Sequence, residues 1–148
     1  MPVTFLSDSP EATRAWAAHL ATELRPPLVI ALYGDLGAGK TVLVKGFAAG
    51  LGVTAPVTSP TFTLINEYSL PEGSALFHAD CYRLSESLDQ AVTEARTVGL
   101  EELFDEGFVL IEWAERVQPL LPTVRLDIEL TGVAPGQRRI LLTDHRYP

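Results

Sequence analysis

A chain of 148 residues, of which 47% are hydrophobic and 20% charged, has the composition of an ordinary globular protein, and we expect residues 1–148 to form a single domain. Its formal net charge of −8 and its two lysines argue against a surface that grips DNA or RNA by the phosphates, so any nucleic acid should be held by a partner. No apolar run approaches the ~20 residues that cross a membrane, no basic residue precedes Arg14 as in a secretory signal, and the lone Cys81 suits a reducing compartment, so we predict a cytoplasmic location.

The first predicted elements are an edge strand and a helix. Residues 3–6 form a short run with strand propensity, expected at the edge of a sheet. Ser9 is a favourable N-cap and Pro10 suits the first helical position, which predicts a helix over about residues 10–24. Apolar side chains repeat every four residues along this helix and should face the core; they are Ala12, Trp16, Leu20 and Leu24.

The most informative stretch is a glycine-rich loop that follows a predicted buried strand at residues 28–33. Residues 34–41 read GDLGAGKT and match the pattern G-x-x-x-x-G-K-[ST] of a phosphate-binding P-loop without a mismatch. Glycines let consecutive backbone N–H groups face phosphate oxygens, the lysine adds a cation, and the threonine hydroxyl can bind Mg²⁺. Apolar residues recur at helical spacing from residue 42 to residue 51, as expected after such a loop. The predicted nucleotide-binding residues of the loop are Asp35, Leu36, Gly37, Ala38, Gly39, Lys40 and Thr41.

A hydroxyl-rich segment comes next, at residues 57–68. Its first half contains Ser59 and Thr61 around a proline, which is typical of a loop, and its second half alternates like a strand. Such a loop can close on Mg²⁺ or the γ-phosphate, as switch loops do. An ordinary turn held by Ser and Thr hydrogen bonds fits the residues equally well, and both interpretations stay open.

Two further predicted strands end in carboxylates. Residues 75–80 form a strand that places His78 and Asp80 on one face, with Asp80 at the carboxyl end, where ligands gather in open α/β sheets. Residues 108–113 place four apolar residues before Glu112, the form of a Walker B strand, whose acid holds Mg²⁺ directly or through water. Both acids are candidates for metal or water roles.

The remaining segments complete the predicted architecture. Residues 85–105 are mostly helical and acidic with a break near Gly99, and their carboxylates favour a solvated face over a partner surface. A short helix near residues 114–120 and strands at 124–130 and 139–143, joined through residues 132–136, should follow. We therefore predict an α/β fold: a P-loop NTPase-like three-layer sandwich with a mixed, mostly parallel sheet flanked by helices and an antiparallel C-terminal hairpin.

Together, five stretches resemble the TsaE family, formerly YjeE. They are GDLGAGKT (34–41), TSPTFTL (58–64), HADCYRL (78–84), GLEELF (99–104) and VLIEWAERV (109–117), in order and over nearly the whole chain. The resemblance implies a small ATPase that binds ATP and Mg²⁺ and hydrolyses ATP weakly by itself. It also implies TsaD-like and TsaB-like partners, which carry threonylcarbamoyl transfer to adenosine 37 of ANN-decoding tRNAs, with tRNA reached only through them.

Carried over by position, the resemblance assigns roles to individual residues. Lys40 and Thr41 bind phosphates and Mg²⁺, and Glu112 is the Walker B metal carboxylate. Asp80 is the second essential acid. Ser59 and Thr61 lie in the switch-like loop, and Trp113 is the family's tryptophan beside the nucleotide. The start of the N-terminal helix, around Thr13, and the hairpin arginines border the base and ribose.

The mechanism we expect is hydrolytic, with Lys40, the loop amides and Mg²⁺ stabilising charge on the transferring phosphoryl group. Glu112 is expected on Mg²⁺ and Asp80 nearer the water or behind the metal ligands. Three alternatives remain. The first is a small-molecule kinase, which would need an acceptor pocket. The second is a GTPase, although this sequence contains neither the N/T-K-x-D nor the D-x-x-G motif of that class. The third is a nucleotide-controlled binding module, which would show negligible turnover.

Overall fold

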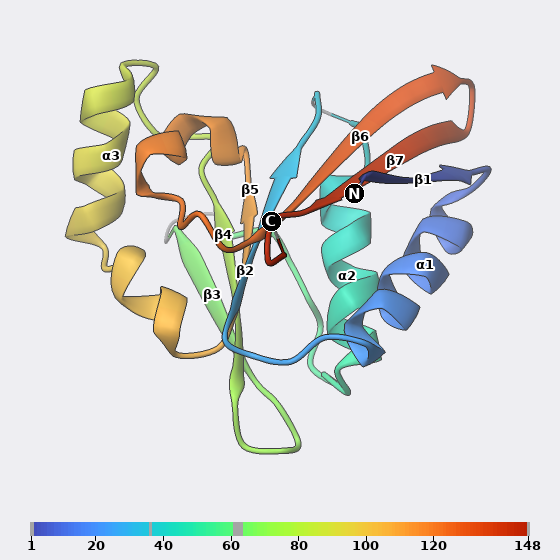
Figure 1. The fold of residues 1–148 in the computed structure, drawn as a ribbon, viewed down its shortest axis with the longest axis horizontal. Helices are drawn as coiled ribbons and strands as arrows, with labels where there is room; N and C mark the ends of the chain where they lie inside the picture. The colour runs from blue at the N-terminus through green and yellow to red at the C-terminus, as the bar shows by residue number, and fades with distance from the viewer. Residues whose placement is uncertain (1, 36, 61–63, 148) are drawn as a thin grey trace.

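A single mixed sheet organises the chain. The computed structural model describes residues 2–35, 37–60 and 64–147, and within them seven strands pair in the order β1-β7-β6-β2-β5-β4-β3 (Figure 1). Strands β6, β2, β5 and β4 run parallel, whereas β7, β1 and β3 join through antiparallel pairings. The predicted fold class, a mixed sheet flanked by helices with an antiparallel C-terminal hairpin, is confirmed.

The elements follow the chain in alternating order. The strands are β1 (Pro2–Ser7), β2 (Leu28–Tyr33), β3 (Ile65–Ser69), β4 (Ala75–Asp80), β5 (Phe108–Glu112), β6 (Leu126–Ala134) and β7 (Gln137–Asp144). The helices are α1 (Pro10–Thr22), α2 (Lys40–Gly50) and α3 (Leu88–Thr97), with 3₁₀ helices η1 (Glu101–Asp105) and η2 (Ala114–Leu120). None of the described helices is both long and apolar enough to span a bilayer.

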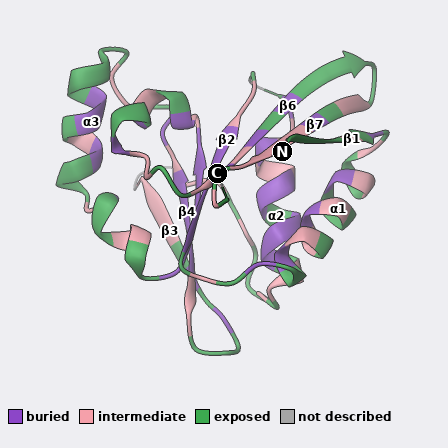
Figure 2. Cartoon of the chain, in the orientation of Figure 1, coloured by how far each residue is buried: buried purple, intermediate pink, exposed green. Residues whose placement is uncertain are grey.

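Each face of the sheet carries its own hydrophobic core. Successive side chains of a strand point to opposite faces, so Ile30 of β2 packs with α1 and α2, while its neighbour Ala31 packs with α3, η1 and η2. The central strands are buried along both faces, and the helices flank them on either side (Figure 2). This burial explains why β2 and β5 are near-continuous apolar runs rather than alternating ones.

The helices α1 and α2 approach each other backbone to backbone. A Cβ at Gly46 would lie 2.5 Å from the carbonyl oxygen of Arg14, and a Cβ at Gly50 would lie 2.3 Å from that of Ala18. Only glycine allows this separation, because real Cβ atoms do not approach backbone oxygens below 3.0 Å. The two glycines thus set how closely α2, and the loop that precedes it, sits against α1.

The structure differs from the prediction mainly in the bounds of elements. The hairpin strands are longer than expected, because β6 continues to Ala134 across a bulge and the turn is confined to Pro135 and Gly136. Helix α1 ends at Thr22, two residues early. The predicted break of the acidic segment is confirmed at Gly99, whose φ of 84° ends α3.

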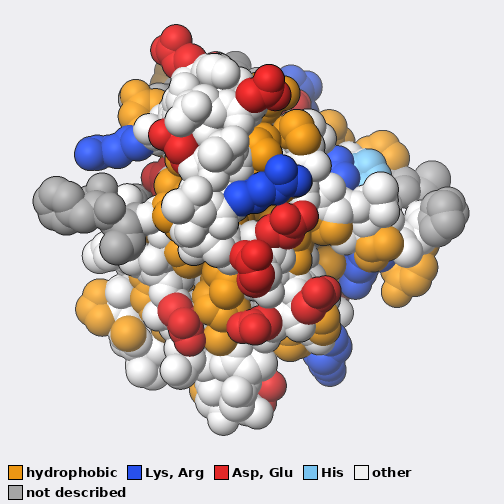
Figure 3. Space-filling view, turned by 90° about the vertical axis from the view of Figure 1, so that its left-hand side faces the viewer, with side chains coloured by type: hydrophobic (Ala, Val, Ile, Leu, Met, Phe, Trp, Pro, Cys, Tyr) orange, Lys and Arg blue, Asp and Glu red, His pale blue; other side chains and the backbone are white. Residues whose placement is uncertain are grey.

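The face covered by α3 is rich in carboxylates. Figure 3 shows acidic side chains spread over this side of the molecule, with basic ones between them. The exposed acidic residues of α3, η1 and their flanks are Glu86, Asp89, Glu101, Glu102, Asp105 and Glu106. Such a face repels phosphate backbones.

Candidate active site at the carboxyl edge of the sheet

The predicted phosphate loop and both predicted acids meet at one edge of the sheet. Strand β5 lies between β2 and β4, and all three run parallel, so their carboxyl ends coincide. Glu112 is in register with Leu32 of β2 on one side and with Asp80 of β4 on the other. The glycine loop (residues 34–39) leaves β2 at this same edge and leads into α2, as open α/β sheets arrange their ligand sites.

Left-handed backbone conformations shape the glycine loop. Gly37 and Gly39 have φ of 83° and 101°, and Gly39 is the N-cap of α2. Gly34, with φ of 145°, passes so close to β6 that a Cβ would lie 2.7 Å from the carbonyl oxygen of Leu130. These features leave the backbone free to turn around an anion at the positive end of the α2 dipole. Leu36, also predicted to bind nucleotide, lies outside the described residues.

Lys40 is buried, at 5% exposure, and folds back over its own loop. Its Nζ donates to the carbonyl oxygen of Gly34 and lies 3.4 Å from that of Asp35. Burial lowers the pKa of the Lys40 ammonium, and the negative charge of Glu112 opposes that shift. An ammonium that donates to backbone carbonyl oxygens can donate to phosphate oxygens instead when a phosphate binds.

Trp113 covers the other side of this ammonium. Its ring centroid lies 3.7 Å from the Nζ of Lys40, a cation–π distance, and 5.1 Å from the ring of Tyr82. Trp113 adopts the left-handed conformation, with φ of 57° and ψ of 44°, which turns the chain sharply from β5 into η2. The aromatic residue expected near the nucleotide thus contacts the loop lysine directly.

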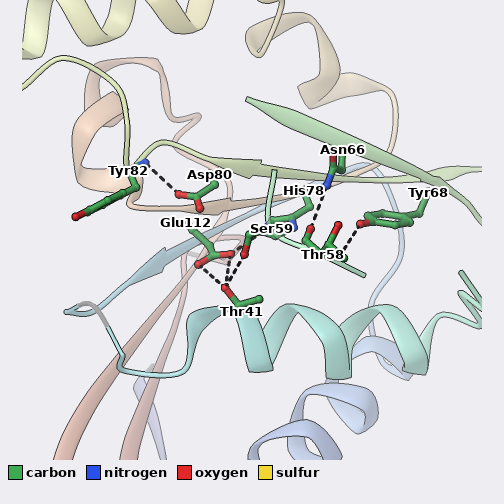
Figure 4. A network of polar contacts seen from close by, with 9 residues as sticks. All are labelled: Thr41, Thr58, Ser59, Asn66, Tyr68, His78, Asp80, Tyr82 and Glu112. Carbon is green, nitrogen blue, oxygen red and sulfur yellow. Dashed lines mark hydrogen bonds and ion pairs between the residues drawn. The ribbon is translucent and has the colours of Figure 1, made fainter. Parts of the chain in front are cut away.

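Thr41 and Glu112 form the centre of a polar network (Figure 4). The Thr41 hydroxyl lies 3.2 Å from Oε1 and 3.1 Å from Oε2 of Glu112, and 3.4 Å from the hydroxyl of Ser59. Ser59 therefore belongs to the site, whereas Thr61 lies outside the described residues. Neighbouring Thr58 is held by Asn66, whose amide donates to its carbonyl oxygen at 3.0 Å.

This donor set suits magnesium. Hydroxyl and carboxylate oxygens are the hard ligands that Mg²⁺ prefers, and it commonly takes one or two carboxylates together with substrate phosphates. Within the described residues, His, Cys, Asp and Glu form no group of three or more that would hold a metal by themselves. A metal at Thr41 and Glu112 would thus depend on the nucleotide for its remaining ligands.

Asp80 lies beside Glu112 but differs in environment. Its Oδ1 accepts a hydrogen bond of 3.0 Å from the backbone N–H of Tyr82, and partial burial raises the pKa of its carboxyl. No described contact joins Asp80 to Thr41. The geometry therefore favours Glu112 as the acid on the metal and leaves Asp80 for water or for outer contacts.

The sequence reasoning named two further residues only in general terms, and the structure gives each of them a specific contact in the site. His78, fully buried, lies with Nε2 2.6 Å from Oε2 of Glu112. Alternation did place it on the face of Asp80, but not against Glu112. Arg138 of β7 donates from Nε to the carbonyl oxygen of Ala38 and from Nη2 to that of Gly37, both at 3.2 Å. Only the general expectation that hairpin arginines border the nucleotide pointed to it.

Two cavities adjoin the loop. One of about 650 Å³ lies toward η2 and the hairpin, with Tyr33, Asp35, Glu115 and Arg138 among its lining residues. A smaller one of about 160 Å³ is lined by Ser9, Thr13, Gly39, Val42, Gly136 and Arg138. The smaller cavity joins the start of α1 to the hairpin arginine, the two regions expected near base and ribose.

Comparison with known proteins matches residues 7–140 to the family "Threonylcarbamoyl adenosine biosynthesis protein TsaE". The chain belongs to the TsaE family. Two relatives carry the name "tRNA threonylcarbamoyladenosine biosynthesis protein TsaE". The one from Bacillus subtilis is 42% identical over 91% of this chain and 81% of its own length. The one from Nostoc is 42% identical over 97% of this chain and 86% of its own length. The crystal structure of Bacillus subtilis YdiB superposes with a TM-score of 0.80 at 37% identity, covering 98% of this chain and 86% of that one.

Membership of the TsaE family agrees with the geometry described above. The matched range, residues 7–140, contains the glycine loop, Asp80, Glu112 and Arg138, so every element that builds the site lies within the family region. The resemblance stated from the five sequence stretches is thereby confirmed.

Proposed function

We propose that this TsaE-family protein binds ATP with Mg²⁺, hydrolyses it slowly, and serves tRNA threonylcarbamoyladenosine biosynthesis together with TsaD-like and TsaB-like partners. The observation that carries the ATPase proposal is the contact of Thr41 with both carboxylate oxygens of Glu112 beside the glycine loop. The names of the relatives support the pathway.

The residues of this chain divide the work of hydrolysis. The loop amides and Lys40 bind the phosphates and stabilise the charge that develops during transfer. Thr41 and Glu112 would hold Mg²⁺, which would supply electrostatic stabilisation of that charge. Asp80, with its raised pKa, orients the attacking water, and Trp113 keeps bulk water from the ammonium of Lys40.

The proposed partners and location rest on the charge of the chain and on its single cysteine. The acidic surface and the two lysines suit a protein that reaches tRNA only through its partners and binds no DNA. Burial raises the pKa of the Cys81 thiol to about 12. We place the protein in the cytoplasm because a single cysteine suits a reducing compartment.

ATP turnover by the purified protein tests the proposal. It should be close to silent alone and rise at least tenfold with TsaD-like and TsaB-like partners and substrate tRNA. Full turnover that does not change when the partners are added would support the ATPase site but contradict the proposed role in tRNA threonylcarbamoyladenosine biosynthesis. Nucleotide-dependent partner binding without any turnover would instead identify a binding module.

A small-molecule kinase retains one observation in its favour. The cavity of about 650 Å³ beside the glycine loop has room for an acceptor. Transfer of labelled phosphate from ATP to a metabolite mixture would establish it, whereas release of phosphate only to water supports the ATPase.

A further inference from the structure

The carboxylate of Glu112 is anchored from behind by a buried histidine. His78 stands two residues before the end of β4, and Glu112 ends the neighbouring strand β5. Their side chains lie on the α2 face of the sheet, where the His78 Nε2 is 2.6 Å from the Glu112 Oε2. His78 is fully buried and Glu112 only 3% exposed, so water does not compete for this bond.

The bond distinguishes the two oxygens of the carboxylate. Oε2 contacts both His78 and Thr41, whereas among the described residues Oε1 contacts Thr41 alone. Occupying Oε2 fixes the rotation of the carboxylate and leaves lone pairs of Oε1 directed to the Thr41 side. That is the side on which the proposed Mg²⁺ would lie.

The other ring nitrogen indicates which tautomer makes the bond. Nδ1 of His78 is buried and has no hydrogen-bond partner among the described residues. A neutral ring with its proton on Nε2 leaves Nδ1 as a bare acceptor, whereas a doubly protonated ring would bury a second N–H that has no acceptor among the described residues. The ring therefore donates from Nε2 to the carboxylate.

We infer that His78 is a positioning residue: it holds the Glu112 carboxylate in the one orientation that presents Oε1 to Mg²⁺ at Thr41. The inference rests on the proposed nucleotide function and adds to it the group that orients the metal ligand. Partners of metal ligands commonly contribute ten- to a hundredfold to metal affinity. Binding of nucleotide without metal should not depend on His78, because His78 touches no part of the glycine loop in any described contact.

The test separates metal binding from nucleotide binding. Mn²⁺ affinity of the protein–ADP complex is measured by electron paramagnetic resonance with protein in excess of ADP, and ADP affinity is measured in EDTA. The matched pair is His78→Gln, whose amide reaches the place of Nε2, and His78→Asn, which is equally polar but too short. Phe77→Leu, on the opposite face of the same strand, controls for packing.

We expect His78→Asn to weaken Mn²⁺ binding at least tenfold while ADP affinity in EDTA stays within twofold. His78→Gln and Phe77→Leu should keep Mn²⁺ affinity within threefold of the unaltered protein. Equal Mn²⁺ affinity in the Asn and Gln variants would overturn the positioning role. Failure of the unaltered protein to bind ADP or Mn²⁺ would refute the proposed function, and the inference with it.

Discussion

The hydroxyl of Thr41, in the first turn of α2, lies within 3.2 Å of both carboxylate oxygens of Glu112, at the end of β5. Seventy-one residues separate the two in sequence, and the parallel pairing of β2 with β5 brings them together. A hydroxyl and a carboxylate at this distance can share one cation. The proposed metal chemistry follows from this pair, and so does the prediction for Glu112 below.

Replacing the buried Lys40 should remove productive ATP turnover. Lys40→Ala takes away the cation proposed to bind the phosphates, and we expect turnover in the partner complex to fall at least about a hundredfold. Lys45→Ala is the control, because Lys45 is an exposed lysine of the same helix. Steady-state phosphate release measures both variants, and near-normal turnover in Lys40→Ala would disprove the assignment of the loop.

Neutralising Glu112 should change the metal requirement. Glu112→Gln keeps the shape but removes the charge, so the Mg²⁺ concentration for half-maximal ATP turnover should rise at least about tenfold. Glu106→Gln alters an exposed carboxylate just before the same strand and should leave that concentration unchanged. A Mg²⁺ titration of turnover compares them; an unaltered midpoint in Glu112→Gln would remove this residue from the metal site.

Much of this site follows from local patterns, and the rest does not. The glycine loop, β4 and β5 are predictable because spacing, apolar runs and terminal acids are local features. The contact of His78 with Glu112 depends on β5 lying next to β4, which strand order decides. Arg138 reaches the loop only because the hairpin folds β7 back beside β6. The left-handed turn at Trp113 has no local signal either, since non-glycine residues rarely adopt it.

The charged carboxylate of Asp80 should lower the stability of the folded protein at neutral pH, although the proposed turnover depends on it. Burial raises its pKa above the unfolded value of 3.8, so the folded protein holds this proton more tightly than the unfolded chain. The stability that this more tightly held proton contributes is complete below pH 3.8, and it is lost as the pH rises through the pKa of the folded protein. Above it, Asp80 is charged and partly buried.

Asp80→Asn removes this charge and keeps an oxygen for the N–H of Tyr82. At pH 7 the variant should therefore have a higher free energy of unfolding than the unaltered protein while losing turnover. Urea unfolding from pH 7 down to pH 4 should show that the stability advantage of Asp80→Asn shrinks as the pH falls. An advantage that is constant with pH would rule out the carboxyl charge as its cause.

The close approach of α1 and α2 predicts an effect opposite to helix propensity. Gly46→Ala would normally favour a helix by up to about 1 kcal/mol, but its Cβ would lie 2.5–2.6 Å from backbone atoms of Arg14. We expect a net loss of about 1–3 kcal/mol as the helices separate. In Gly132→Ala the new Cβ meets only a side-chain nitrogen at 3.8 Å, so little change is expected. Urea unfolding measures both, and a stabilised Gly46→Ala would contradict the packing.

Arg138 should matter for nucleotide affinity although it comes from outside the sequence motif. Its guanidinium donates to the carbonyl oxygens of Gly37 and Ala38, and so holds the loop in shape from the side of the hairpin. Losing two charge-assisted hydrogen bonds should weaken ATP binding about tenfold, equivalent to about 1.4 kcal/mol.

Arg138→Ala is best compared with Arg139→Ala, because Arg139 is the next residue of β7 and is exposed. Isothermal calorimetry with ATP and Mg²⁺ should show the loss in Arg138→Ala alone, while both variants unfold at similar urea concentrations. Equal affinities would mean that the glycine loop keeps its shape unaided. Equal losses would instead point to the general positive charge of the hairpin, because that charge falls by one in either variant.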